Sequence, residues 1–474
     1  MSLNFSSDVV VVGCGGAGIA AAIAARERNV EVLVLEKLGA PGGNSVFPAG
    51  PFAVESPVQK RLDIDASRDI FFKQAMEYSH WRLDPKLVRT WIDRTGDTIS
   101  WLEEKGVEFT GLRLLYPTQK VPVWHMIKGV GARHLFEVLL KRCETLGIRI
   151  LYRTTAKKIL IDEKGKVSGV LALTEGKWFI IAAKSVIIAT GGYGGNKELL
   201  KKYCPSYHEN MVNCGLPHMG DGLLMALDVG AATEGLGILQ LNGPQVPNSV
   251  VLTFIVKNPD NILVNRKGER FVDETIVPFP EMANAVDRQP EKIVYALFDE
   301  KIRQKVIKEW VDDPKMELPP VTEVEKEFKK YLEKGYIKIS GSWDEIAEWI
   351  GCDPKILKVT IDEYNSFCDS GYDRMFAKDK RHLVPLRTPP YYAIKAHSGY
   401  YNTIGGIKVN SNMEVLNKED KPIPGLYAAG VDVGGWETET YNAHLSGSTF
   451  SFALTSGRIA GENAADYVIN KWRT

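Results

Sequence analysis

The sequence has few cysteines and no motif that pairs them. Six cysteines are spread over 474 residues, and no two are spaced as C-x-x-C. This excludes the usual ligand spacings of zinc sites and iron–sulfur clusters, and the lack of C-x-x-C-H excludes an attached c-type haem. We therefore expect no metal and free thiols, as in a cytoplasmic protein. The cysteines are Cys14, Cys143, Cys204, Cys214, Cys352 and Cys368.

An excess of charge of either sign is also absent. Lys and Arg together number 59, as do Asp and Glu, so the formal net charge is zero. Without a basic stripe, binding to nucleic acid or to anionic lipid is not expected. The most apolar stretch, residues 9–25, follows no Lys or Arg and is interrupted by glycines, which argues against a signal peptide. We expect a cytoplasmic protein without a transmembrane segment.

What the sequence does contain is a glycine pattern between an apolar strand and an apolar helix. The four valines of Val9–Val12 predict a strand buried on both faces, and Ile19–Arg26 predicts the following helix. Between them, Gly13 allows the bend and Gly15 lets a pyrophosphate approach the backbone. Gly18 lets the helix pack closely on the strand.

A carboxylate follows at the spacing that this pattern requires. Glu36 ends a second apolar strand, Val32–Leu35, about 20 residues after the glycines, where an acid accepts hydrogen bonds from the adenosine ribose. The N–H groups at the start of the helix face the diphosphate in such an arrangement. Strand, turn, helix, strand and acid in this order predict a dinucleotide site. The alternative, a glycine-rich turn in an ordinary βαβ unit, leaves Glu36 unexplained.

The chain is too long for one hydrophobic core, so we expect two domains. A nucleotide-binding pattern occupies residues 1–244 and returns at residues 386–474, while residues 245–385 carry short capped helices and are interpreted as an inserted cap domain. In that insert, Ser342 and Glu345 predict a capping box, and Asp353 before a proline predicts a helix start. Elsewhere we expect one helical stretch over residues 66–105 and a final helix over residues 448–470.

Further short blocks occur in order along the whole chain. After the first glycine pattern come Gly42–Ser45, Ala189–Gly192, Gly220–Gly222, Asn265–Glu274, Thr403–Gly406 and Ile423–Gly430. In this order the blocks resemble the fumarate reductase/succinate dehydrogenase flavoprotein family, which also holds 3-ketosteroid dehydrogenases, urocanate reductase and L-aspartate oxidase. The resemblance implies an α/β fold: a doubly wound, glutathione-reductase-like domain that binds FAD, covalently or not, and an inserted α+β cap domain that closes over the substrate.

The residues themselves also favour FAD over NAD. No second G-x-G-x-x-G is present, whereas a second glycine-rich strand exit and a C-terminal return of the nucleotide-binding pattern are. A helix start near residue 448 would stabilise negative charge on the flavin. The family has an acid directly after the Ala-Ala-Gly turn, whereas Asp432 stands one position later here. From that position Asp432 either contacts the ribityl chain or does not reach it. The predicted cofactor-binding residues are Gly13, Gly15, Gly16, Ala17, Gly18, Glu36, Lys37, Gly43, Asn44, Ser45, Ala156, Thr190, Gly191, Asp221, Gly430, Asp432, Ser446, Ser448 and Thr449.

The four residues that hold two carboxylates in fumarate reductases have no counterparts here. The family's two histidines fall on Asn242 and Asn402, its proton-donating arginine on Pro278 and its second arginine on His444. Two carboxylates in a dry site without fixed cations are poorly compensated. We therefore predict that neither fumarate nor succinate is the substrate.

Neutral aromatic residues remain where the substrate is expected. In the ketosteroid-type relatives, tyrosines donate a proton to, or remove one from, the carbon beside a carbonyl. For each tyrosine here the alternative to such a catalytic role is packing in the core. His125 and His218 are interpreted as structural, and Arg270 and Glu274 as joining the cap to the FAD domain. The candidate catalytic residues are Tyr401, Tyr441, His444 and Tyr400.

The sequence thus predicts an FAD-dependent oxidoreductase that transfers a hydride between flavin N5 and a CH–CH or C=C unit beside a carbonyl. The substrate would be a small molecule such as an enone, a ketosteroid-like ketone or an enoate, with an unidentified electron donor or acceptor as partner. Two alternatives stay open: an amino-acid or amine oxidase of the aspartate oxidase type, and a flavoprotein subunit of an electron-transfer complex.

Overall fold

The computed structural model describes residues 5–116, 119–276, 279–312, 321–438 and 441–472. Its internal contacts divide the chain into two units. The first comprises Met1–Tyr207, Gly215–Gln240 and Tyr401–Thr474, and the second His208–Cys214 and Leu241–Tyr400. The chain passes from one unit to the other at both ends of His208–Cys214 and within two long strands, β10 (Thr233–Gln245) and β14 (Tyr391–Ile407). The cap-domain boundaries at residues 244 and 386 stay a prediction.

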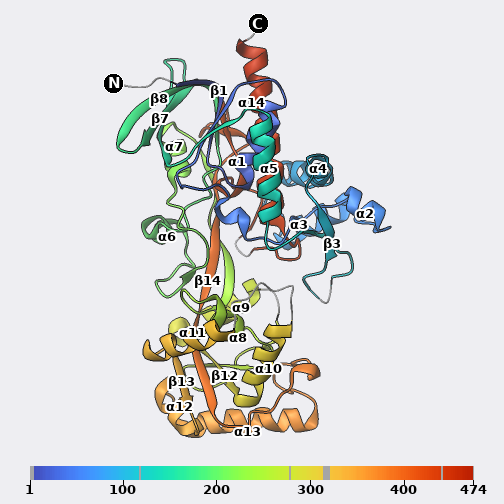
Figure 1. Cartoon of the computed structure of the whole chain (residues 1–474), viewed down its shortest axis with the longest axis vertical. Helices are drawn as coiled ribbons and strands as arrows, with labels where there is room; N and C mark the ends of the chain where they lie inside the picture. The colour runs from blue at the N-terminus through green and yellow to red at the C-terminus, as the bar shows by residue number, and fades with distance from the viewer. Residues whose placement is uncertain (1–4, 117–118, 277–278, 313–320, 439–440, 473–474) are drawn as a thin grey trace. The chain divides into compact units, whose positions relative to one another are not determined.

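The first unit is built on an eight-stranded sheet with the path β15-β16-β8-β1-β2-β5, and β7 joins β6 to β8 (Figure 1). Strand β1 pairs in parallel with β2 and β8. Its Val9, Val10 and Val11 side chains are fully buried, as expected for a strand covered on both faces. The strands are β1 (Phe5–Val12), β2 (Val32–Leu35), β5 (Arg149–Leu151), β6 (Thr154–Ile161), β7 (Val167–Thr174), β8 (Lys177–Ile188), β15 (Glu414–Leu416) and β16 (Pro422–Ala428).

Two helices from opposite ends of the chain, α1 (Gly16–Arg26) and α14 (Ser448–Trp472), pack backbone to backbone in this unit. A Cβ added at Gly457 of α14 would lie 2.2 Å from the carbonyl oxygen of Ala17, and one added at Gly461 would lie 2.2 Å from that of Ala21. No larger side chain fits at either glycine, so this close approach requires both. The unit's other elements are α2 (Pro57–Arg61), α3 (Arg68–Tyr78), α4 (Pro85–Glu104), β3 (Phe109–Arg113), β4 (Trp124–Ile127), α5 (Arg133–Thr145), α6 (Lys197–Tyr203) and α7 (Asp221–Asp228).

The helical stretch predicted over residues 66–105 is two helices, α3 and α4. Pro85 is the first residue of α4, and the side chain of Asp84 caps that helix by accepting hydrogen bonds from the backbone N–H groups of Lys86 and Leu87. A proline with a capping acid before it begins a helix and does not continue the preceding one, which explains the break. The final helix is confirmed and ends two residues later than predicted, at Trp472.

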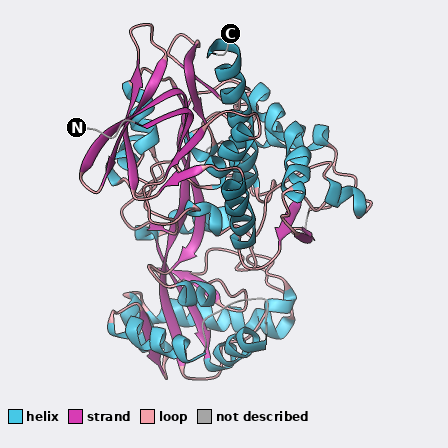
Figure 2. Ribbon diagram, turned by 45° about the horizontal axis from the view of Figure 1, so that its top comes forward, coloured by secondary structure: helices cyan, strands magenta, loops and turns pink. Residues whose placement is uncertain are grey.

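The second unit holds a six-stranded sheet of order β10-β14-β12-β11, with β9 and β13 also paired to β14. All seven side chains of β12 are buried, and helices cover the sheet (Figure 2). These elements are β9 (Val212–Asn213), α8 (Val250–Val256), β11 (Ile262–Asn265), α9 (Phe279–Asp287), β12 (Ile293–Asp299), α10 (Glu300–Asp312), α11 (Val321–Glu333), β13 (Ile337–Ser340), α12 (Trp343–Ile350) and α13 (Pro354–Ser370).

The two predicted helix starts of this unit have different outcomes. Asp353 caps α13 by accepting a hydrogen bond from the N–H of Lys355, as predicted. Ser342 caps α12, but Glu345 does not complete the capping box, because its carboxylate accepts a hydrogen bond of 2.8 Å from the Ser340 hydroxyl. The predicted helix start at Ser342 is thus confirmed, and the predicted bond between Glu345 and the backbone of Ser342 is wrong.

Within the described ranges, no helix combines the length and the apolar character needed to cross a membrane. The same residues contain no group of three or more His, Cys, Asp or Glu side chains that could hold a metal ion.

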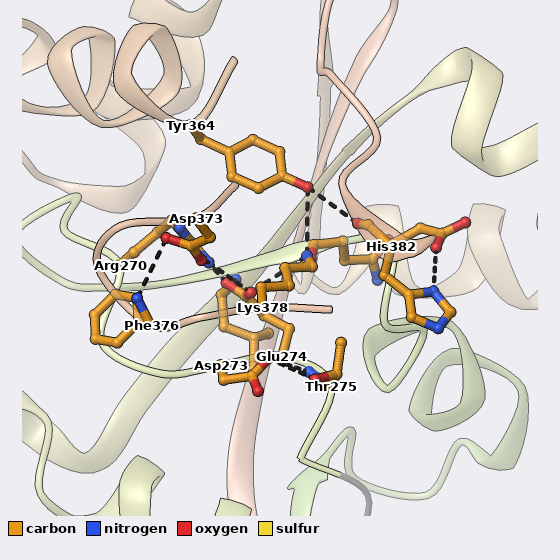
Figure 3. A network of polar contacts seen from close by, with 12 residues as sticks. Arg270, Asp273, Glu274, Thr275, Tyr364, Asp373, Phe376, Lys378 and His382 are labelled. Atoms are coloured by element: carbon orange, nitrogen blue, oxygen red, sulfur yellow. Dashed lines mark hydrogen bonds and ion pairs between the residues drawn. The ribbon is translucent and has the colours of Figure 1, made fainter. Parts of the chain in front are cut away.

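A buried network of charges stabilises the second unit (Figure 3). The Arg270 guanidinium donates to Glu274 at 2.8 and 3.0 Å and to Asp373 at 3.0 Å, and the Lys378 ammonium lies 3.3 Å from Glu274. All four side chains are at most 2% exposed, and their charges balance. The interpretation that Arg270 and Glu274 join the two domains is therefore corrected: these bonds hold the second unit itself together.

Replacing Asp373 by Asn is expected to destabilise this unit. The change leaves Arg270 and Lys378 with one carboxylate between them, and removing one partner of a buried ion pair costs about 3 kcal/mol or more. Urea unfolding followed by tryptophan fluorescence measures the loss. The matched control is Asp369→Asn, because Asp369 pairs with Arg387 but is 62% exposed, where ion pairs add little. Equal losses of stability in the two variants would contradict the importance of the network.

Candidate functional site

The turn after β1 has the geometry that its glycines predict. Gly13 has φ +104°, and a Cβ there would lie 2.2 Å from the carbonyl oxygen of Ala189. A Cβ at Gly18 would lie 1.9 Å from the carbonyl oxygen of Gly13. The first position therefore needs glycine for its conformation and the second for close packing.

Gly15 differs from these two, because none of the described residues requires glycine there. Its φ is −79°, and the only atom near an added Cβ is the carbonyl oxygen of Gly42, at 3.7 Å. Gly15 caps α1 without a side-chain hydrogen bond, and the first turn of α1 contains no acidic residue. The space at Gly15 and the backbone N–H groups beside it thus fit the diphosphate of a dinucleotide.

Glu36 is held rigidly at the end of β2. Its carboxylate oxygens accept hydrogen bonds from the backbone N–H of Cys14 at 2.8 Å and of Leu38 at 2.7 Å, and the residue is 8% exposed. Nearby in sequence, Lys37 forms an ion pair of 2.7 Å with Asp221, so the structure joins two of the predicted cofactor-binding residues. The contacts of these residues with a cofactor stay a prediction.

Asp432 holds the second glycine-rich turn. Its carboxylate accepts hydrogen bonds from the N–H and hydroxyl groups of Thr190 and, at 3.0 Å each, from the N–H groups of Gly191 and Gly192. The residue is 1% exposed. Asp432 therefore fixes the turn that carries Thr190 and Gly191, while a bond from its carboxylate to the ribityl chain stays a prediction.

The two histidines interpreted as structural lie in different surroundings. His125 is fully buried, with one ring nitrogen 2.6 Å from the Ser56 hydroxyl and the other 3.0 Å from the carbonyl oxygen of Val123, and burial lowers its pKa to about 4. His218 instead packs among the predicted cofactor residues, since a Cβ at Gly191 would lie 2.9 Å from its Nε2 atom. Burial, followed by the nearby Lys37 charge, lowers the pKa of His218, so the ring is neutral at pH 7.

Neutral amides surround one of the expected substrate positions. The Asn44 amide donates to Asn402 Oδ1 and, at 3.2 Å, to the carbonyl oxygen of Tyr401. Asn402 in turn donates to Gln240 Oε1 at 2.9 Å. The Asn44–Asn402–Gln240 chain of amides carries no charge, so these three side chains offer a ligand hydrogen bonds without a positive charge. Pro278, another of the four positions, lies outside the described residues.

Tyr441 and His444 share the segment that leads into α14. The Tyr441 hydroxyl accepts a hydrogen bond of 3.0 Å from Ser448, and burial raises its pKa, so the phenol keeps its proton at pH 7. The His444 ring stacks on Tyr116 with the ring centroids 4.3 Å apart. The Ser446 hydroxyl donates to the carbonyl oxygen of Ala443 in the same segment.

Tyr400 and Tyr401 are consecutive residues of β14. Side chains of consecutive strand residues leave opposite faces, so at most one of the two serves a given side of the strand. Tyr400 is 3% exposed and Tyr401 is half-buried. Of the four predicted catalytic residues, the structure therefore places Tyr441 and His444 in one segment and directs Tyr400 and Tyr401 apart.

Ser45 and Gly430 lie close to the start of α1. A Cβ at Gly16 would lie 2.9 Å from the Ser45 hydroxyl oxygen and 3.2 Å from the Phe450 ring, and a Cβ at Gly430 would lie 3.0 Å from that of Ala17. Ala156 is buried on β6. Thr449 is the second residue of α14.

Lys257 was missed by the sequence reasoning. Its ammonium donates a hydrogen bond of 3.0 Å to Asn242 Oδ1, and Asn242 is one of the four positions where the sequence analysis expects a dicarboxylate-binding residue to be replaced. Burial lowers the pKa of Lys257 to about 8. The signal in the sequence was the position of this lysine, which directly follows the apolar run Val250–Val256.

Comparisons with known proteins agree with this geometry. Residues 8–448 match the family described as the FAD binding domain. The vinyl phenol reductase of Lactiplantibacillus plantarum is 31% identical over 98% of this chain and 97% of its own length. A cytochrome-type fumarate reductase of Shewanella frigidimarina is 31% identical over 97% of this chain and 77% of its length. The open conformation of a flavocytochrome c3 fumarate reductase superposes with a TM-score of 0.79 at 27% identity, covering 98% of this chain and 79% of that one.

These matches confirm the expected α/β fold class, FAD as the cofactor and an oxidoreductase as the class of enzyme. They span both units of the chain. The protein therefore belongs to the FAD binding domain family, among the flavoprotein oxidoreductases that include the fumarate reductases and vinyl phenol reductase.

Proposed function

We propose that the protein reduces a carbon–carbon double bond conjugated with a carbonyl or an aromatic ring, or runs the reverse oxidation, and that fumarate is not its substrate. The observation that carries this proposal is the presence of buried asparagines, Asn242 and Asn402, at the two positions of the family histidines. Asn402 lies in a chain of uncharged amides, which cannot compensate a dicarboxylate. The same residues disfavour an amino-acid oxidase of the aspartate oxidase type.

The relatives support this choice of substrate class. Vinyl phenol reductase, named for an alkene attached to a phenol ring, matches this chain from end to end. The fumarate reductase has the same 31% identity, so overall identity does not separate the two activities. The residues at the substrate positions separate them instead, because only a dicarboxylate needs several fixed cations.

FAD, when bound, supplies or accepts the hydride at the substrate carbon. The backbone at Gly15 and the start of α1 would hold its diphosphate, and Glu36 its adenosine ribose. Thr190 and Gly191, in the turn fixed by Asp432, would line the same cofactor. Ser446, Ser448 and Thr449 would present the start of α14 to the flavin, where the positive end of a helix favours the reduced, anionic state.

Tyr441 is the proposed proton donor to the second carbon. Its phenol is protonated at pH 7, and because Ser448 donates to the phenol oxygen, the Tyr441 proton is available to another acceptor. The Ser448 hydroxyl also stabilises the phenolate that remains after proton transfer, since its hydrogen bond lowers the pKa that burial raises. In the oxidising direction the same phenolate would remove the proton.

The proposed activity is tested with photoreduced protein mixed anaerobically with candidate substrates, while reoxidation of the flavin is recorded. Aromatic enoates, vinyl phenols, enones and 3-ketosteroids form the panel, and fumarate is included at the same concentration. We expect at least one conjugated, non-dicarboxylate compound to reoxidise the flavin and fumarate not to do so. Reoxidation by fumarate alone would overturn the proposal.

Tyr441→Phe is expected to lower the rate of that reoxidation by about a hundredfold, which is the typical contribution of a general acid. Its FAD content should not change, because the ring is kept. The control is Tyr372→Phe, at a residue that is 62% exposed, for which the wild-type rate is expected. A wild-type rate in Tyr441→Phe would assign the proton to another residue, with His444 as the next candidate.

Gly15→Ala is expected to weaken FAD binding by about tenfold or more without destabilising the apoprotein. The new methyl group meets no protein atom closer than 3.7 Å and the backbone conformation suits alanine, so the only obstructed partner is the diphosphate. Titration of apoprotein with FAD and a thermal melt of the apoprotein measure the two effects. Gly341→Ala, where an added Cβ meets nothing within 4 Å, is the control. Unchanged FAD affinity in Gly15→Ala would place the diphosphate elsewhere.

A further inference from the structure

A lysine and two amides gather on the second unit beside one of the expected substrate positions. Asn242 is 1% exposed, and its Oδ1 atom accepts the 3.0 Å hydrogen bond from Lys257. The Cys214 thiol lies near both, because the Lys257 charge and the Asn242 amide each lower the thiol pKa that burial raises. These three side chains come from β10, from the end of α8 and from the residue after β9, so tertiary packing alone brings them together.

Gln245 adds an unsatisfied donor to this group. A Cβ at Gly399 would lie 2.8 Å from Gln245 Cγ and 3.0 Å from Cys214 Sγ, so both side chains border Gly399. Gln245 is 6% exposed, and its Nε2 atom has no hydrogen-bond partner among the described residues. A buried N–H group without an acceptor costs about 1–3 kcal/mol, which a ligand oxygen would recover.

Lys257 is held in place by its helix. Val251, Leu252, Ile255 and Val256 of α8 are buried in the core of the second unit, and Ser249 caps the helix through a 3.1 Å bond to the N–H of Leu252. Lys257 follows directly as the last residue of this anchored turn. Its ammonium therefore occupies a defined position instead of sampling solvent.

The cluster carries one positive charge near neutral pH. The pKa of Lys257 is about 8, so the ammonium is protonated at pH 7 and loses its proton only above that value. Burial raises the pKa of Cys214 to about 11, so the thiol stays neutral over the same range. Asn242 and Gln245 are neutral at any pH. A single cation with amide donors matches a ligand with one anionic oxygen group, and not one with two.

We propose that Lys257 binds the single carboxylate of a conjugated enoate substrate, with Asn242 orienting the ammonium and Gln245 donating a second hydrogen bond. This inference rests on the proposed function, because Asn242 is a substrate position only within it. It narrows the substrate class from any conjugated alkene to a monocarboxylate. The carboxylate is the electron-withdrawing group that activates the double bond, so binding at Lys257 also favours the charge that builds up on it during hydride addition.

The test measures binding without turnover, so that it stands apart from the proposed activity. Oxidised holoenzyme is titrated with 3-phenylpropanoate and with its methyl ester, and the change of the flavin spectrum gives each dissociation constant. Lys257→Met is expected to weaken binding of the acid by about tenfold to a hundredfold, as for a lost charge-assisted hydrogen bond, and to leave the ester unchanged. Lys257→Arg, which keeps the charge, should recover most of the affinity.

The controls separate charge from folding. Lys358→Met removes an exposed lysine of α13 in the same unit and should bind the acid as the wild type does. Asn242→Asp keeps the shape of the site but places a carboxylate beside the Lys257 ammonium. This variant should bind 3-phenylpropanoate more weakly than the wild type and bind the methyl ester equally well. Equal affinity of wild type and Lys257→Met for the acid, or failure of the wild type to bind it, would overturn the inference. Failure of every panel compound to reoxidise the reduced flavin would instead overturn the proposed function.

Discussion

The close approach of α1 and α14 assembles the predicted FAD site from the two ends of the chain. Gly457 and Gly461 lie so near the backbone of α1 that no larger residue fits at either position. Because α14 is held at this distance, its first turn brings Phe450 to within 3.2 Å of the Cβ position of Gly16. The Tyr441 hydroxyl, in the segment before α14, accepts its hydrogen bond from Ser448, the first residue of that helix. The strand-to-helix turn before α1 and Tyr441, the proposed proton donor before α14, thus both adjoin helices that this contact joins.

The parts of the fold that could be predicted from the sequence are those determined by local chemistry. Gly13 and Gly18 are required by a positive φ and by a close approach within a few residues, and both requirements are met as expected. The cap at Asp353 is equally local. Pro85 carried the same kind of information and was overlooked: a proline preceded by an acid begins a helix, so the long predicted helix is in fact two.

The rest of the site depends on contacts between distant segments. The bond from Lys257, after α8, to Asn242 of β10 joins two different elements, and the partners of Arg270 include Asp373, which lies 103 residues away in sequence. Asp432 had an uncertain position in the motif, and the structure shows its carboxylate bonded to the turn at Thr190. No pattern of spacing in a single sequence contains such pairings. The sequence analysis did not single out Lys257 or Asp373, and the bonds of all these residues came from the structure.

Charge compensation links the site to the proposed substrate. A family member that binds two carboxylates must offset two negative charges in a dry site. In the first unit the Asn44–Asn402–Gln240 amides are uncharged, and in the second unit we propose that Lys257 binds a single carboxylate. The central claim is therefore that the number of carboxylates decides binding. It is tested most directly by competition between a saturated monocarboxylate and the dicarboxylate of equal chain length for the oxidised wild-type protein, followed through the flavin spectrum. The account predicts tighter binding of the monocarboxylate, and tighter binding of the dicarboxylate would contradict it.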